Sequence, residues 1–203
     1  MTVFPITPLL PDIRAALANH PRLVLEAPPG AGKTTQVPLA LLQQPWLDGK
    51  ILMLEPRRIA ARAAAQFMAQ QLGETVGRTV GYRIRFEAKV SDATRIEVIT
   101  EGILTRLIQR DPELAGIGAI VFDEFHERQL AGDLGAALAL DIQATLRPDL
   151  RLLLMSATLD GERIAQWLDA PRLSSPGRSF PVRIAHPSAR TQESIEHQLA
   201  RVA

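Results

Sequence analysis

The chain has 203 residues, of which 46% are hydrophobic, and this length allows one domain with a substantial core without requiring two. The formal net charge is only +1, so no overall charge marks a nucleic-acid-binding or membrane-surface protein, and any basic patch must be local. Because the sequence contains no cysteine, disulfides, thiol catalysis and sulfur-ligated metal centres are excluded.

Residues 1–12 contain three prolines and no lysine or arginine, so this segment lacks the charged and apolar regions of a signal peptide. No uncharged apolar run approaches the length that is needed to span a membrane. These features predict a cytoplasmic protein without a membrane partner.

Short apolar runs alternate with longer helical stretches, which predicts an α/β fold with a mostly parallel sheet and helices on both faces. The expected strands are residues 22–27, 50–55, 94–100, 119–123 and 151–157, with a further strand at 180–186 and a weaker one at 79–86. The expected helices are residues 33–44, 57–72, 101–110 and 133–146. The composition becomes polar near the end, so we expect one domain over residues 1–186, followed at 187–203 by a linker or the start of another segment.

The segment "APPGAGKTT", residues 27–35, follows the first expected strand and precedes a helix. It matches the Walker A phosphate-binding pattern, with Ala27 in place of the first glycine. Gly30 and Gly32 allow backbone N–H groups to approach phosphate oxygens, and the helix N-terminus favours an anion. The alternative is a Pro/Gly turn that happens to precede a lysine, but strand, loop and helix all agree with the functional interpretation.

The residue types in this loop predict distinct roles with ATP and Mg²⁺ as ligands. Lys33 is expected to bind the β- and γ-phosphates, Thr34 to bind Mg²⁺ through its hydroxyl, and Thr35 to reach the α-phosphate. The candidate nucleotide-binding residues are Pro29, Gly30, Ala31, Gly32, Lys33, Thr34 and Thr35.

A second candidate segment is "AIVFDEFHER", residues 119–128, in which an apolar run meets five ionisable side chains. The apolar run is most simply a buried strand, so the acids stand at the carboxyl end of a parallel sheet, where ligands bind. Asp123 is then expected to hold Mg²⁺ and Glu124 to polarise the attacking water, with both acids as candidate metal ligands. A solvated charge run is a weaker alternative, and a zinc site is weaker still, because the nearest other histidines are His20 and His186.

The motifs taken together resemble those of the DEAH/RHA-type superfamily 2 helicases. "DEFHER" resembles motif II, with Phe125 where alanine is usual. The other matches are "LEPRRIAAR" (54–62) with motif Ia, "GYRIRFE" (81–87) with a stretch typical of the group, "TEGILTR" (100–106) with motif Ib and "MSATLD" (155–160) with motif III. The match covers roughly residues 10–186 and is most like the bacterial HrpB branch. It implies a RecA-like P-loop NTPase domain, the N-terminal motor lobe of an ATP-dependent RNA helicase.

The resemblance also implies contacts with a nucleic-acid backbone, with RNA favoured over DNA. Arg57 and Arg58, which alone would suggest the basic first turn of a solvated helix, are expected to bind backbone phosphates. Thr100 and Gly102 are expected to contribute a hydroxyl and a closely approaching N–H group.

Three further residues take their expected roles from the resemblance alone. Ser156 and Thr158, which otherwise suggest a turn or a helix cap, are expected to couple the phosphate state to the movement of a partner lobe. His126 is expected to form hydrogen bonds across the cleft between the lobes. The expected catalytic residues are Lys33, Asp123, Glu124 and His126, whereas Glu127 and Arg128 have no assigned role.

Two departures from the family pattern matter. An arginine that stacks on the nucleotide base in several relatives corresponds here to Phe67, which can also stack but in an Ala-rich helix is more often a core residue. Motifs V and VI, which belong to a second RecA-like lobe, have no match, so we expect that lobe to act as a partner. An arginine finger is worth about 10³ to 10⁵ in rate, so this chain alone is expected to bind nucleotide but to hydrolyse it poorly.

Other P-loop proteins fit the sequence less well. A GTPase should carry Asn-Lys-x-Asp, but the only asparagine is Asn19, which His20 follows. An ABC-type ATPase should carry an "LSGGQ"-like stretch, which is missing, and a small-molecule kinase would leave "MSATLD" unexplained. A nucleotide-binding module without helicase activity is the remaining alternative.

Overall fold

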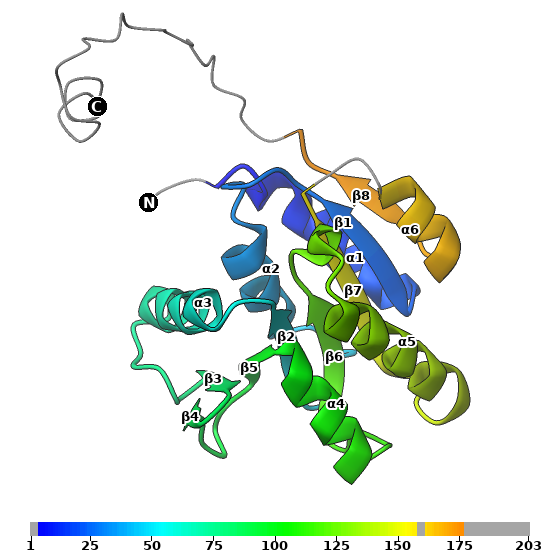
Figure 1. Cartoon of the computed structure of the whole chain (residues 1–203). Helices are drawn as coiled ribbons and strands as arrows, with labels where there is room; N and C mark the ends of the chain where they lie inside the picture. The colour runs from blue at the N-terminus through cyan, green and yellow to red at the C-terminus, as the bar shows by residue number, and fades with distance from the viewer. Residues whose placement is uncertain (1–3, 158–160, 177–203) are drawn as a thin grey trace, which may run out of the picture.

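In the computed structural model, which describes residues 4–157 and 161–176, eight strands form one sheet with helices on both faces (Figure 1). The strand order is β4-β3-β5-β2-β6-β7-β1-β8, and all neighbours are parallel except β3 and β4. The strands are β1 (Arg22–Glu26), β2 (Lys50–Glu55), β3 (Val80–Ile84), β4 (Glu87–Lys89), β5 (Ile96–Thr100), β6 (Ile117–Phe122), β7 (Arg151–Ser156) and β8 (Arg172–Ser174). The helices are α1 (Leu10–Asn19), α2 (Lys33–Leu41), α3 (Arg58–Gln71), α4 (Glu101–Arg110), α5 (Leu130–Thr145) and α6 (Gly161–Leu168), with 3-10 turns η1 (Thr7–Leu9) and η2 (Phe125–Glu127).

The two faces of the sheet are buried by different helices. Helices α1, α2 and α3 pack on one face, and α4, α5 and α6 pack on the other (Figure 1). In β1 the fully buried Leu23 and Leu25 belong to the first core, and Val24 between them belongs to the second. Because both faces are covered, the central strands are continuous apolar runs rather than alternating ones.

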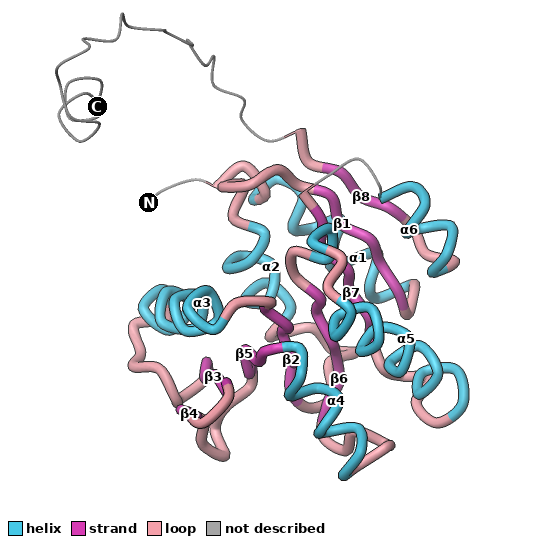
Figure 2. Tube along the Cα trace, in the orientation of Figure 1, coloured by secondary structure: helices cyan, strands magenta, loops and turns pink. Residues whose placement is uncertain are grey.

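The mostly parallel α/β class that the sequence predicts is confirmed. The five main expected strands correspond to β1, β2, β5, β6 and β7, and the four expected helices correspond to α2, α3, α4 and α5. Helix α5 begins at Leu130, three residues earlier than expected, and α2 ends at Leu41. The weaker strand over residues 79–86 is β3, which ends at Ile84 and reverses into the antiparallel β4 (Figure 2). The strand expected at 180–186 and the linker at 187–203 lie outside the described residues.

Six described elements were not expected from the sequence, namely α1, α6, β4, β8 and the two 3-10 turns η1 and η2. Helix α1 forms in a proline-rich region because a proline stands in its first turn, where a missing N–H group loses no helical hydrogen bond. Strand β8 has three residues and α6 has eight, so each offers too short a periodic pattern to be distinguished from a loop.

The parallel direction of the strands determines where function can lie. Strands β1, β2, β5, β6 and β7 all end at the same edge of the sheet, and the segments that follow them gather there. Across this edge Glu55 of β2 lies opposite Thr100 of β5, and Glu26 of β1 lies opposite Ser156 of β7. Residues that are far apart in the sequence therefore meet at one edge.

Candidate active site

The phosphate-binding loop connects β1 to α2, and two glycines shape it. Gly30 and Gly32 have φ angles of 76° and 91°, a left-handed region that glycine adopts without a steric penalty. A Cβ atom at Gly32 would lie 2.8 Å from the ring of Phe4. The N-terminal segment also holds the loop, because the N–H of Ile6 donates to the carbonyl oxygen of Ala31 at 3.0 Å. The glycine backbone angles and the contacts with the N-terminal segment therefore both restrict the conformation of the loop.

The first two residues of α2 contact the two acids that follow β6. Lys33 Nζ lies 2.6 Å from Glu124 Oε1, and Lys33 is only 3% exposed. The hydroxyl of Thr34 donates to Asp123 Oδ2 at 2.5 Å. The structure thus brings together the Walker A loop and the acidic segment that the sequence singled out separately.

A third carboxyl group, Glu55 at the end of β2, lies beside Asp123, and sequence reasoning missed it. Burial, reinforced by the negative charge of Asp123, raises the pKa of Glu55 to about 9, so Glu55 is protonated at neutral pH and shares a hydrogen bond with Asp123. Burial also raises the pKa of Asp123, against the opposing effects of the Lys33 charge and the Thr34 hydrogen bond. The cost of burying these acids favours a positively charged ligand at the site.

The ligand set around Asp123 is of the kind that Mg²⁺ prefers. The Thr34 hydroxyl and the Asp123 carboxylate are both oxygen donors, and they touch each other at the end of the phosphate-binding loop. Among the described residues no group of three or more His, Asp or Glu side chains is arranged to hold a metal ion. Mg²⁺ in nucleotide sites commonly uses one or two protein oxygens together with phosphates and water, and the donors here fit that mode.

The acidic segment turns sharply after β6, and His126 anchors it to β7. Glu124 and Arg128, on either side of η2, both have φ of 49°, which is a strained value for residues other than glycine. Nδ1 of His126 accepts a hydrogen bond from the N–H of Ala157 at 3.2 Å, and Nε2 of His126 lies 3.4 Å from Glu124 Oε2. His126 therefore connects the acids to the end of β7 within this lobe.

The end of β7 adjoins the phosphate-binding loop. Ser156 is 1% exposed, and its carbonyl oxygen accepts a hydrogen bond from the N–H of Ala27 at 3.0 Å. The other coupling residue expected from the sequence, Thr158, lies outside the described residues. The coupling role of both residues stays a prediction.

A hollow of about 570 Å³ opens beside the phosphate-binding loop. Its lining residues are Phe4, Pro29, Gly30, Gly32, Lys33, Thr34, Thr35, Glu55, Ala60, Ala63, Ala64, Phe67 and Glu124. One wall is therefore polar and the other is apolar, formed by small residues of α3 and two phenyl rings. Phe67 is 42% exposed, and its ring meets that of Phe4 edge to face with centroids 6.4 Å apart. The structure thus places Phe67 at the wall of the hollow rather than in the core, and adds Phe4, which sequence reasoning missed.

The residues expected to contact nucleic acid lie along the same edge of the sheet. Arg57 and Arg58 are exposed at the start of α3, directly after β2. Thr100 ends the neighbouring strand β5, and Gly102 lies in the first turn of α4. A Cβ atom at Gly102 would meet nothing within 4 Å, so the backbone there is open to a partner. The structure brings these four residues together at the ends of the adjacent parallel strands β2 and β5.

The β3–β4 hairpin adds an exposed aromatic residue to this edge. Phe86 at its tip is 90% exposed and has a φ of 69°, and the guanidinium of Arg85 lies 4.7 Å from its ring centroid. Because β3 pairs in parallel with β5, with Arg83 opposite Ile99, the tip stands at the edge where β5 ends. An exposed phenyl ring beside an arginine is a feature of single-stranded nucleic-acid surfaces. Sequence reasoning recognised the stretch but not these two residues.

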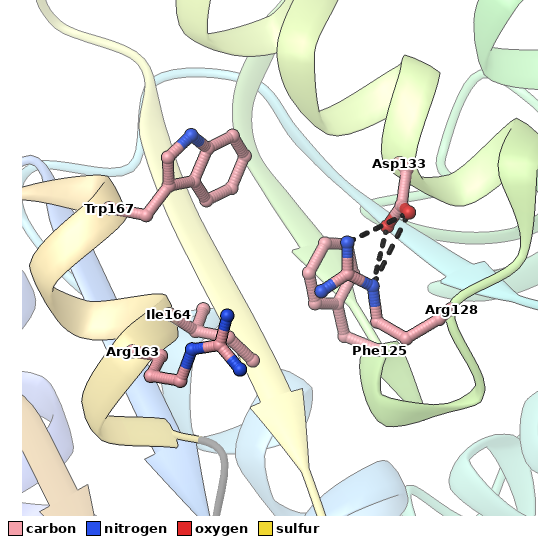
Figure 3. A pocket seen from close by; sticks show the side chains of 6 residues that line it. All are labelled: Phe125, Arg128, Asp133, Arg163, Ile164 and Trp167. Atoms are coloured by element: carbon pink, nitrogen blue, oxygen red, sulfur yellow. Dashed lines mark hydrogen bonds and ion pairs between the residues drawn. The ribbon is translucent and has the colours of Figure 1, made fainter.

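A second hollow, of about 350 Å³, lies between η2, the start of α5 and α6 (Figure 3). It shares no lining residue with the hollow beside the phosphate-binding loop. Arg128 lies on one side, paired with Asp133 at 3.0 Å and with its guanidinium 5.5 Å from the ring centroid of Phe125. Arg163 and the 55% exposed Trp167 line the other side. Arg128, unassigned from sequence, is therefore an exposed side chain that pairs with Asp133 at this second hollow.

The fold and this site define a RecA-like P-loop domain of the helicase type. The DEAD/DEAH box helicase family matches residues 12–167, and the chain belongs to this family. The resemblance that the motifs suggest is thereby confirmed.

The chain is similar to two bacterial RNA helicases. It is 55% identical over 183 residues to the ATP-dependent RNA helicase HrpB of Escherichia coli, covering 90% of the chain and 23% of that protein. It is 35% identical over 184 residues to the ATP-dependent RNA helicase HrpA homolog of Haemophilus influenzae, covering 90% of the chain and 14% of that protein.

Solved structures show the same relationship. A crystal structure of the Escherichia coli DEAH/RHA helicase HrpB matches with a TM-score of 0.89 and 50% identity, covering 98% of this chain and 26% of that one. A crystal structure of the Escherichia coli DExH-box NTPase HrpB matches with a TM-score of 0.85 and 50% identity, covering 100% and 25%. The chain thus spans about a quarter or less of the length of these relatives. Within the described residues, no helix is both long and apolar enough to cross a membrane.

Proposed function

We propose that the chain is the nucleotide-binding motor lobe of an ATP-dependent RNA helicase, with Mg-ATP as its ligand and RNA as its partner. The observation that carries the proposal is the meeting of Lys33 and Thr34 with Glu124 and Asp123 at one edge of the sheet. The relatives that are named ATP-dependent RNA helicases support the choice of ATP and of RNA. A cytoplasmic location belongs to the same proposal.

In the proposed mechanism, Lys33 exchanges the Glu124 carboxylate for the β- and γ-phosphates of ATP. Thr34 and Asp123 would hold Mg²⁺, and a bound Mg²⁺ would offset the charge that develops on the transferred phosphoryl group. Glu124, released from Lys33, orients and polarises the attacking water. His126 holds the acidic segment in place through its contact with the N–H of Ala157.

The nucleic-acid backbone is proposed to run along the ends of β3, β5 and β2. Arg57 and Arg58 would bind phosphate oxygens, and Thr100 and Gly102 would approach the backbone closely. The phenyl ring at the tip of the β3–β4 hairpin would stack on a base. Such contacts depend strongly on salt and little on base sequence.

A second RecA-like lobe is proposed to complete the catalytic site. The chain spans about a quarter of the HrpB relative, so most of that helicase's length has no counterpart in these residues. Without an arginine finger the hydrolysis rate is expected to be lower by about 10³ to 10⁵, so the chain alone should bind ATP and turn it over slowly.

The proposal is tested by ATP hydrolysis with and without single-stranded RNA, measured for this chain and for a longer protein that adds a second RecA-like lobe. We expect slow hydrolysis by the chain, faster hydrolysis by the longer protein, and a further increase with RNA. Glu124→Gln should keep Mg-ATP binding and lose turnover. An active longer protein that ignores RNA would contradict the helicase proposal, and ATP binding without any turnover would support a binding module instead.

A further inference from the structure

Glu127, to which the sequence gives no role, forms an ion pair with one of the candidate nucleic-acid contacts. Its Oε1 lies 2.7 Å from Nη2 of Arg57. The Arg57 side chain is 71% exposed, whereas that of Glu127 is 24% exposed, so the arginine reaches in from solvent to a more enclosed carboxylate. An exposed pair of this kind contributes little to stability, and another anion can replace the carboxylate.

The surroundings of Glu127 are otherwise acidic. Burial, together with the charges of Asp133 and Glu127, raises the pKa of Glu101. Arg128, the next residue along the chain, is paired with Asp133 instead (Figure 3). The amide of Gln129 donates to Glu127 Oε2 at 3.2 Å but carries no charge. Within the described part of the chain, Arg57 is therefore the cation that the structure pairs with Glu127.

Glu127 occupies one N–H edge of the Arg57 guanidinium, a position that a phosphate oxygen could also take. Phosphate and carboxylate oxygens accept hydrogen bonds from a guanidinium at the same distances, and both prefer its N–H edge. A phosphate that approaches the Nη2 edge of Arg57 therefore competes with Glu127 for the same N–H groups, and it meets a carboxylate on a neighbouring segment.

The segment that carries Glu127 also carries the acid that contacts Lys33. Glu124 directly precedes the turn η2, and Glu127 is the last residue of that turn, so the two acids are close in the sequence. Glu124 is held by Lys33, and Glu127 is held by Arg57. Nucleotide phosphates compete for the first cation, and nucleic-acid phosphates compete for the second.

We propose that Glu127 is a positioning residue that competes with the nucleic-acid backbone for Arg57 and thereby links nucleic-acid affinity to the nucleotide site. The inference rests on the proposed function. When Lys33 turns to a nucleotide phosphate, Glu124 loses its ion pair with Lys33 and keeps its contacts with His126 and Asp123. The released side chain lets η2 shift, and the ion pair between Glu127 and Arg57 weakens. Nucleotide binding then raises RNA affinity, and by linkage RNA raises nucleotide affinity by the same factor.

The test measures the affinity of the chain for a fluorescein-labelled single-stranded RNA by anisotropy at about 50 mM salt, because phosphate contacts are strongest there. Glu127→Gln keeps the size of the side chain and removes its charge. We expect it to bind RNA about three- to tenfold more tightly than the unmutated chain without nucleotide, the effect of freeing roughly one phosphate contact. Glu127→Ala, with folding checked by circular dichroism, should change affinity in the same direction.

Two controls separate this competition from a general change in charge. Asp149→Asn also removes one acid from an ion pair, with Arg147 at 2.6 Å, but this pair precedes β7 and so lies at the opposite edge of the sheet. It should leave RNA affinity unchanged. In a double-mutant cycle, the gain in RNA affinity from Glu127→Gln should disappear when Arg57→Gln is also present, because the guanidinium for which Glu127 and phosphate compete is then missing.

A third arm adds Mg²⁺ and a non-hydrolysable ATP analogue. The nucleotide should tighten RNA binding by the unmutated chain, and this gain should be smaller in Glu127→Gln. The inference is overturned if Glu127→Gln binds RNA no more tightly than Asp149→Asn, or if its gain persists with Arg57→Gln. An equal nucleotide effect in both proteins overturns the link to the nucleotide site. Failure of the unmutated chain to bind RNA overturns the proposed function as well, whereas the other outcomes leave that function standing.

Discussion

Lys33 Nζ and Glu124 Oε1 lie 2.6 Å apart, and this contact joins the first residue of α2 to the acid that follows β6. A lysine that is 3% exposed needs a nearby anion, because an unpaired buried charge is costly. Glu124 supplies that anion where a nucleotide phosphate would otherwise do so. The proposed nucleotide binding at this site would therefore exchange one anion for another.

The exchange of Glu124 for phosphate should change the free energy of unfolding. Glu124→Ala is expected to lower the free energy of unfolding by about 1–3 kcal/mol without nucleotide, because Lys33 loses its nearest partner. Mg-ATP should then stabilise the variant more than the unmutated chain, since phosphate restores the anion. Urea denaturation measures both effects. Asp149→Asn, which changes a carboxylate that is itself 58% exposed, should cost less than Glu124→Ala, and Mg-ATP should stabilise it no more than the unmutated chain. Equal stabilities of Glu124→Ala and the unmutated chain in both conditions would contradict the exchange.

Glu55 predicts a dependence of stability on pH. Its folded-state pKa is about 9, above its ordinary value of 4.5, so the unfolded chain releases this proton first. Below about pH 4.5 the group is neutral in both states, and as the pH rises toward 9 the folded state loses stability relative to the unfolded state. The glutamine of Glu55→Gln carries no charge at any pH. The variant should therefore have nearly the same free energy of unfolding as the unmutated chain at pH 4.5, and should be increasingly more stable than that chain up to pH 9.

The slope of that gain should be at most about 1.4 kcal/mol per pH unit, and thermal or urea unfolding in EDTA buffer measures it without bound cations. A stability difference between Glu55→Gln and the unmutated chain that is the same at pH 5 and pH 8.5 would show that Glu55 does not titrate as its burial implies.

The phosphate-binding loop and the acidic segment could be located from sequence because each is a local pattern. A buried strand, a glycine-rich turn and a helix start follow one another directly around Gly30 and Gly32, and an apolar run ends at Asp123. Glu55 could not be found in this way. At the end of "KILMLE" it looks like an ordinary polar strand terminus, and only the strand order, which places β2 beside β6, brings it against Asp123.

The surroundings of the site escaped sequence reasoning for similar reasons. Phe4 lies in a segment that prolines make unlike a helix. It reaches Gly32 because the chain before η1 runs beside the loop, where the N–H of Ile6 donates to the carbonyl oxygen of Ala31. The sequence allowed Phe67 to be either a core residue or a stacking residue, because helical spacing alone does not show which neighbour faces it. Arg85 and Phe86 are exposed because they form the turn between β3, which ends at Ile84, and β4.

The two glycines Gly32 and Gly102 should respond oppositely to alanine. Gly32→Ala is expected to cost about 1–3 kcal/mol of stability and to weaken ATP binding, because its φ is 91° and its new Cβ would press on Phe4. Gly102→Ala lies in a helix with open space around it, so it should leave ATP binding unchanged and stabilise the chain by up to about 1 kcal/mol. Thermal unfolding and ATP titrations check both, and equal effects at the two sites would refute the assigned geometry.

The hairpin tip should matter for RNA and not for folding. Phe86→Ala removes a ring that is 90% exposed, so stability should hardly change. If the ring stacks on a base, RNA affinity should fall by an amount of about 1–3 kcal/mol. Trp167→Ala is the matched control, since Trp167 is an exposed aromatic residue on α6, beside the second hollow. Equal losses of RNA affinity in the two variants would argue against a specific role for the hairpin.

Calorimetric titration of ATP with and without Mg²⁺ tests most directly whether Thr34 and Asp123 hold Mg²⁺ together with the nucleotide. Mg²⁺ should tighten ATP binding by the unmutated chain, and Thr34→Ala and Asp123→Asn should each remove most of that gain. Because the two side chains act on one ion, the double variant should lose little more than either single one. If ATP binding ignores Mg²⁺, or if Asp123→Asn keeps the full gain, the site described here is not the metal–nucleotide site.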